Sequence, residues 1–144
     1  MKASKGEAYE RDVAEALAAE LAGGRLGLVP DCVRLRRKPS YFSPNRGRPI
    51  TFDLSVEVFR EDAVVPYWIW LWECKNYAGP VQIEDVEEFH AKLEQIGADR
   101  TKGTIVTTEG FAKGAFAYAK SKGIGLFRYV AGDVLVSLLD FLVA

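Results

Sequence analysis

The strongest constraint on the fold comes from two neighbouring segments, 50–59 and 67–76, whose side chains alternate with the period of two that is typical of β-strands. In the first segment, one face is apolar and carries Phe52, Leu54, Val56 and Val58. In the second, one face carries Trp68, Trp70, Trp72 and Cys74, and the opposite face is also mostly apolar. A strand that is apolar on both faces is expected in the centre of a sheet.

A hairpin of these two segments, with its turn centred at Ala63, matches apolar residues with apolar residues on one face. The same register places Asp53 opposite Glu73, and Lys75 lies on the face of Glu73. A slip of one residue would mix polar and apolar faces. The pattern therefore predicts two carboxylates side by side, with an ammonium group near them.

Two opposed carboxylates repel each other, because cross-strand neighbours lie only ~4.5–5.5 Å apart. A raised pKa would relieve the repulsion, and so would a bound cation such as Mg²⁺, which prefers oxygen ligands. Lys75 could hold or activate a water, or stabilise charge on a phosphate. A metal, a positioned water and a cationic group are together the parts needed to hydrolyse a phosphodiester. An ordinary cross-strand salt bridge from Lys75 to Asp53 or Glu73 is the alternative interpretation.

The segments before this hairpin predict a helix, a short strand and a loop. Ser4 and Glu7 fit a capping box at the start of the helix, and Gly23 ends it. A strand is expected over 32–37, and the segment 38–49 is expected to be a loop because it contains three prolines and a glycine.

The second half of the chain is expected to alternate between helix and strand. The predicted elements are helix 84–97, strand 103–107, helix 111–122 and strand 124–129. Asp133 could cap a last helix whose apolar positions are Leu135, Leu138, Leu139 and Leu142. The predicted order is α-β-β-β-α-β-α-β-α, an α/β domain with a mixed sheet.

Basic side chains are concentrated in one segment. Between Asp31 and Asp53 there is no acidic residue and there are six basic ones, which are Arg34, Arg36, Arg37, Lys38, Arg46 and Arg48. The rest of the chain holds 13 basic against 20 acidic side chains. Such asymmetry is typical of a surface that contacts phosphates. An equally good interpretation is an edge strand and loop, where basic residues discourage pairing with another sheet.

Length and composition exclude several classes of protein. With 144 residues, about half of them apolar, we expect one domain spanning 1–144. Cys32 and Cys74 lack CxxC spacing and His90 is the single histidine, so a zinc site is not expected. The sequence has no apolar run of ~18 residues and no signal peptide. We therefore expect a cytoplasmic protein with reduced thiols and no membrane contact.

Three motifs resemble known nucleases. WECKNY at 72–77 resembles the E-x-K strand of PD-(D/E)XK nucleases, with Asp53 at the position of the family's first aspartate. GEAYE at 6–10 resembles the G-x-x-F-E start of Mrr-type restriction endonucleases and Holliday-junction resolvases, and 102–126 is similar to an Mrr-type strand and alanine-rich helix. The resemblance covers roughly residues 6–129. It implies a restriction-endonuclease-like three-layer α/β/α fold with a mixed central sheet.

The resemblance also implies roles for individual residues. Asp53 and Glu73 would bind Mg²⁺, which Mn²⁺ could replace, with the Cys74 backbone carbonyl as a further ligand. Lys75 would orient or deprotonate the attacking water. Glu10 would approach from the first helix as a second-metal or supporting carboxylate.

Other positions are less well defined by the resemblance. Gln82 is either a neighbour of the site or the start of the following helix. The chain departs from the family pattern because Thr51 and Phe52, and no proline or glycine, precede Asp53, and because many Mrr-type proteins carry glutamine at the position of Glu73.

The resulting functional hypothesis is a metal-dependent DNA endonuclease with an Mrr-like role in restriction, defence or DNA processing. The segment from Arg34 to Arg48 would contact the DNA backbone. Cutting both strands would need two sites, so a homodimer or larger assembly is expected, with the C-terminal helix as a possible contact. Two alternatives stay open: a non-catalytic nucleic-acid-binding or assembly module that keeps the nuclease fold, and a Holliday-junction resolvase.

Overall fold

The structure is a computed structural model that describes residues 4–140. Within this range the main sheet has six strands, in the order β1-β4-β5-β6-β7-β8. Their bounds are β1 (Val33–Arg37), β4 (Leu54–Val58), β5 (Trp68–Lys75), β6 (Thr101–Thr107), β7 (Gly125–Arg128) and β8 (Val136–Leu139). β5, β6 and β7 are parallel to one another and the other pairings are antiparallel, so the sheet is mixed.

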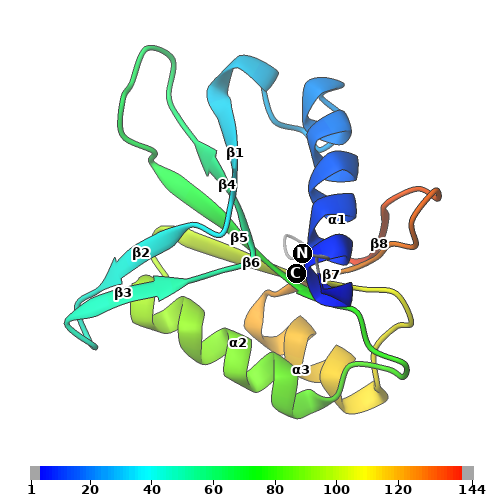
Figure 1. The fold of residues 1–144 in the computed structure, drawn as a ribbon. Helices are drawn as coiled ribbons and strands as arrows, with labels where there is room; N and C mark the ends of the chain where they lie inside the picture. The colour runs from blue at the N-terminus through cyan, green and yellow to red at the C-terminus, as the bar shows by residue number, and fades with distance from the viewer. Residues whose placement is uncertain (1–3, 141–144) are drawn as a thin grey trace.

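Helices cover both faces of this sheet (Figure 1). α1 (Lys5–Ala22) packs on the face that carries Trp70 and Trp72. α2 (Ile83–Ile96) and α3 (Lys113–Lys122) pack on the opposite face. The sheet thus separates two apolar cores. None of the helices within 4–140 is long and apolar enough to cross a membrane.

The predicted hairpin register is confirmed. β4 pairs antiparallel with β5, and Leu54, Val56 and Val58 lie opposite Trp72, Trp70 and Trp68. These residues belong to the core under α1, as the period-two pattern requires. β5 lies between β4 and β6, with helices on both sides, so its two apolar faces are both covered.

The predicted strand 50–59 is wrong in its first half. The segment divides into β3 (Arg48–Thr51) and β4, and β3 pairs with β2 (Ser40–Ser43) in a separate two-stranded sheet. The predicted loop 38–49 therefore contains most of a hairpin. At the break, Phe52 leaves the face of Leu54 and packs against Phe89 of α2, with 6.5 Å between ring centroids.

The first helix is confirmed, whereas the last is wrong. Ser4 caps α1, and its Oγ accepts a hydrogen bond from the Glu7 backbone N–H at 3.1 Å. Asp133 does not begin a helix: the chain continues into β8, which pairs antiparallel with β7. A short leucine-rich run fits either element, and pairing with an exposed strand edge decided it here. Leu142 lies outside the described residues.

The order of elements consequently differs from the prediction. A short 3₁₀ turn, Pro30–Cys32, precedes β1, two additional strands form the β2–β3 hairpin, and β8 replaces the last helix.

Candidate active site

Asp53 lies immediately before β4, one residue beyond the last paired position, Leu54–Trp72. Its Oδ2 accepts a hydrogen bond from the Cys74 backbone N–H at 2.8 Å, which fixes the carboxylate against the C-terminal half of β5. The Asp53 carboxylate is near enough to Glu73 to raise the pKa of Glu73, although burial is the larger cause.

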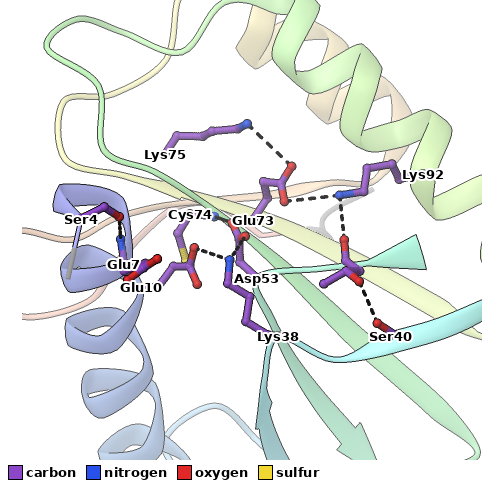
Figure 2. A network of polar contacts seen from close by, with 11 residues as sticks. Ser4, Glu7, Glu10, Lys38, Ser40, Asp53, Glu73, Cys74, Lys75 and Lys92 are labelled. Atoms are coloured by element: carbon purple, nitrogen blue, oxygen red, sulfur yellow. Dashed lines mark hydrogen bonds and ion pairs between the residues drawn. The ribbon is translucent and has the colours of Figure 1, made fainter. Parts of the chain in front are cut away.

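Glu10 extends from α1 toward Asp53, and the Lys38 ammonium lies between their two carboxylates (Figure 2). The Lys38 Nζ lies 2.8 Å from Glu10 Oε2 and 3.4 Å from Asp53 Oδ1, so two carboxylates share one ammonium. Burial raises the pKa of Glu10, and the hydrogen bond from Lys38 counteracts part of that rise. Lys38, predicted to contact DNA, is thus placed between two carboxylates.

Glu73 is held by two lysines on the other side of Asp53 (Figure 2). Lys75 Nζ lies 3.7 Å from Glu73 Oε2, and Lys92 Nζ of α2 lies 3.7 Å from Glu73 Oε1. Lys92 is a residue that the sequence analysis missed. Its spacing offered a signal, because it stands three residues after Phe89 and four before Ile96, on the side of α2 that faces the core.

The charge state of Lys75 follows from its neighbours. Burial alone would lower its pKa, but the carboxylate of Glu73 and the hydroxyl of Tyr77 outweigh burial and raise the pKa above its usual value. The Lys75 ammonium also lies 5.8 Å from the centre of the Tyr77 ring. Lys75 is therefore a positively charged donor at neutral pH.

The six residues form what we call the carboxylate–lysine cluster: Glu10, Asp53, Glu73, Lys38, Lys75 and Lys92. Within residues 4–140, no three His, Cys, Asp or Glu side chains come close enough together to hold a metal ion. The donor chemistry nevertheless fits a hard dication, because the oxygens of Glu10 and Asp53 already converge on one cation, the Lys38 ammonium.

The other predicted DNA-binding residues divide into two groups. Arg36 forms an ion pair with the buried Glu57 at 3.3 Å, and the Arg34 guanidinium lies over the Phe59 ring at 5.5 Å. Both belong to β1, an edge strand of the six-stranded sheet, so the edge-strand interpretation fits them. Among the described residues, no carboxylate lies within ion-pair distance of the remaining three, which are Arg37, Arg46 and Arg48.

Gln82 begins the following helix. It is the N-cap of α2 and forms a capping box with Asp85, and its side-chain amide donates to the Pro80 carbonyl at 3.2 Å. These contacts give it a structural role at the helix start.

Comparisons with known proteins give two structural similarities and one family match. The chain is similar to a protein of unknown function, AF1548, with 18% identity and a TM-score of 0.59 over 88% of this chain and 61% of that one. A second similarity, to the DNA modification-dependent restriction endonuclease AspBHI, has 18% identity and a TM-score of 0.45 over 92% of this chain and 35% of that one. This chain therefore spans less than two thirds of either protein.

The family comparison is more informative. No curated protein matches the sequence. The model of the Mrr catalytic domain, described as a restriction endonuclease, matches residues 53–139, a range that begins at Asp53 and includes Glu73 and Lys75. This chain belongs to the Mrr restriction-endonuclease family of PD-(D/E)XK-like domains.

Proposed function

We propose that this chain is a Mg²⁺-dependent DNA endonuclease whose active site is the carboxylate–lysine cluster. The observation that carries the proposal is a continuous set of contacts between charged groups: Lys38 joins Glu10 of α1 to Asp53, and Asp53 accepts a hydrogen bond from the Cys74 N–H of β5. Glu73, next to Cys74 in β5, pairs with Lys75. Buried carboxylates and ammonium groups cost folding free energy unless they are paired, and such clusters are typical of active sites. Membership of a restriction-endonuclease family supports DNA as the substrate.

Each residue has a role in this proposal. Asp53, Glu73 and the Cys74 carbonyl would hold Mg²⁺, for which Mn²⁺ could substitute, and Glu10 would add a carboxylate from α1. Bound there, the metal would neutralise phosphate charge and lower the pKa of a water. Lys75 would orient or deprotonate that water and stabilise charge on the phosphate.

The non-catalytic alternative also has an observation in its favour. Each of the three carboxylates already has a lysine partner, and no set of three metal ligands converges within residues 4–140. A protein that kept this fold only to bind DNA or a partner would need no metal. Retention of Glu10, Asp53, Glu73 and Lys75 together argues for the enzyme.

Incubation of supercoiled plasmid with the protein and Mg²⁺ or Mn²⁺ tests the proposal. We expect metal-dependent cleavage by the wild type and by Asp31→Ala, an exposed aspartate outside the cluster, and a loss of at least ~100-fold in Asp53→Ala and Lys75→Ala. The same assay on linear, methylated and branched DNA defines the substrate class.

Two results would overturn the proposal in different ways. Absence of metal-dependent cleavage on all four substrates favours the non-catalytic module. Wild-type rates in Asp53→Ala would place the active site elsewhere.

A further inference from the structure

The β2–β3 hairpin is fixed against the rest of the molecule beside α2 (Figure 1). The Ser43 hydroxyl, which is fully buried, donates to the Gln95 carbonyl of α2 at 2.8 Å. The Tyr41 hydroxyl lies 2.8 Å from both Ser55 Oγ and Glu57 Oε2 of β4. Because it is hydrogen-bonded to a helix and to the main sheet, the hairpin has a fixed position relative to both.

A groove of about 510 Å³ lies between this hairpin and α2, and we call it the hairpin groove. Its charged lining consists of Arg46, Arg48, Glu88 and Lys92, three cations against one anion. Arg46 and Arg48 are exposed, and within residues 4–140 no carboxylate lies within ion-pair distance of either. Their guanidinium groups are therefore available to an anionic ligand.

Lys92 joins the hairpin groove to the carboxylate–lysine cluster. Its Nζ donates to the Thr51 carbonyl at 3.2 Å, lies 4.6 Å from the centre of the Phe52 ring, and pairs with Glu73 at 3.7 Å. Three contacts hold the ammonium at the boundary between groove and cluster, although the side chain is still 22% exposed. A nucleic-acid backbone bound in the groove would therefore pass Lys92 and continue to Glu73.

We propose that the hairpin groove binds the sugar–phosphate backbone of the DNA strand that enters the carboxylate–lysine cluster, with Lys92 as the positioning residue at its inner end. The inference rests on the proposed function, because DNA as substrate comes from there. Phosphate contacts by arginine and lysine fix the position of a nucleic acid without reading its sequence. Arg46 and Arg48 then carry backbone binding, while Arg34 and Arg36 mainly protect the sheet edge.

Fluorescence anisotropy with a labelled 20-base-pair duplex, in EDTA and over a series of salt concentrations, tests the groove without requiring cleavage. Arg46→Ala/Arg48→Ala should bind roughly tenfold more weakly at low salt. Its plot of log affinity against log salt should be shallower by about 2, because two phosphate contacts are lost. The matched control is Arg25→Ala/Lys102→Ala, which removes the same charge from a different pocket beside Trp68 and should leave the slope unchanged.

Lys92 needs a readout that a purely structural role would not change. Lys92→Met keeps an apolar stem over Phe52, and Lys92→Arg keeps the charge. We expect Lys92→Met to raise KM for plasmid several-fold with a smaller effect on kcat, and to lower the salt slope by about 1, whereas Lys92→Arg restores both. Equal melting temperatures of the variants exclude misfolding.

The outcomes separate this inference from the proposed function. If the wild type binds DNA and the double variant binds it equally well with an unchanged slope, the groove assignment is wrong whether or not the protein cleaves. If the double variant binds weakly as expected but the wild type does not cleave, the groove assignment stands and the enzyme proposal fails. Absence of any DNA binding by the wild type overturns the groove assignment, and the cleavage assay then decides the enzyme proposal by itself.

Discussion

The ammonium of Lys38 links two elements that are far apart in the sequence, because Glu10 of α1 and Asp53 of the β3–β4 break both contact it. Lys38 has a backbone φ of 50°, in the left-handed region that a non-glycine residue adopts at a cost. Its backbone N–H donates to the Asp53 carbonyl at 2.9 Å, which helps to stabilise this conformation. The backbone of Lys38 and its side chain are thus both tied to Asp53.

Glu73 gives a pH-dependent prediction. Its pKa is raised in the folded protein, chiefly by burial, so folding favours the protonated form. Glu73 ionises more readily in the unfolded chain than in the folded protein. The free energy of unfolding therefore falls as the pH rises from about 4.5 through the folded-state pKa of Glu73. Glu73→Gln should raise the melting temperature at pH 7 to 8, and the difference from wild type should vanish below about pH 4.5.

Calorimetric melting curves over pH 4 to 8 measure this difference. Glu61→Gln, at an exposed position outside the cluster, serves as the control and should show no such trend. A Glu73→Gln protein that is less stable than wild type at pH 7 would mean that the pairs with Lys75 and Lys92 outweigh burial.

Sequence patterns located some of these residues and not others. Asp53, Glu73 and Lys75 followed from strand alternation, which is local, and Glu10 from a motif at the helix start. Lys38 was interpreted as a phosphate contact because it belongs to the basic segment. Its carboxylate partners are 15 and 28 residues away in sequence, so no local pattern indicated them. Lys92 was missed for the same reason: its contact with Glu73 depends on how α2 lies against the sheet.

Among the elements, α2 lies so close to β6 that the residue beneath it must be small. A Cβ added at Gly103 would lie 2.5 Å from Leu93 Cδ1 and 2.7 Å from a ring carbon of Phe89. Gly103→Ala should lower the free energy of unfolding by about 1–3 kcal/mol through overpacking, as measured by urea denaturation. In Gly79→Ala, the control, an added Cβ meets nothing within 4 Å. Equal stability of the two variants would show that α2 can move aside.

Errors in the predicted elements have a common cause. Apolar alternation fixed the pairing of β4 with β5, because both partners of each pair are apolar and a slip is costly. Alternation continues through Phe52, however, so it gave no sign that the strand breaks there. The leucines after Asp133 fit both periods, and the deciding factor, the free edge of β7, is not a local property.

At the scale of the whole molecule, the carboxylate–lysine cluster occurs once within residues 4–140, so one chain presents one candidate site. The C-terminal helix predicted after Asp133, a possible dimer contact, is replaced by β8 over Val136–Leu139. A single site cuts one strand at a time. Supercoiled plasmid should therefore become nicked circles before linear DNA appears, unless chains assemble on the DNA.

A time course on agarose gels at several protein concentrations measures this order. Linear DNA that forms without a nicked intermediate, at a rate proportional to a higher power of protein concentration, would indicate cleavage by paired chains. The predicted homodimer would then need an interface other than a terminal helix.

The basic segment from Arg34 to Arg48 does not form one continuous surface in the folded molecule. In the sequence it is one positive stretch, but the fold distributes it over three places: the edge strand β1, the carboxylate–lysine cluster and the hairpin groove. Charge counting along a chain cannot separate these, since the hairpin reverses direction between Ser43 and Arg48. Only the tertiary structure distinguishes cations with a carboxylate partner from those without one.

The tryptophans of β5 provide an intrinsic spectroscopic probe of the fold. Trp70 and Trp72 have ring centroids 4.9 Å apart and are almost completely buried under α1, on the opposite face of the sheet from α2. Indoles this close couple their excited states, and a buried indole emits at shorter wavelength than one in water. Near-ultraviolet circular dichroism and intrinsic emission therefore report on the packing of α1 against the sheet, on the face away from the hairpin groove.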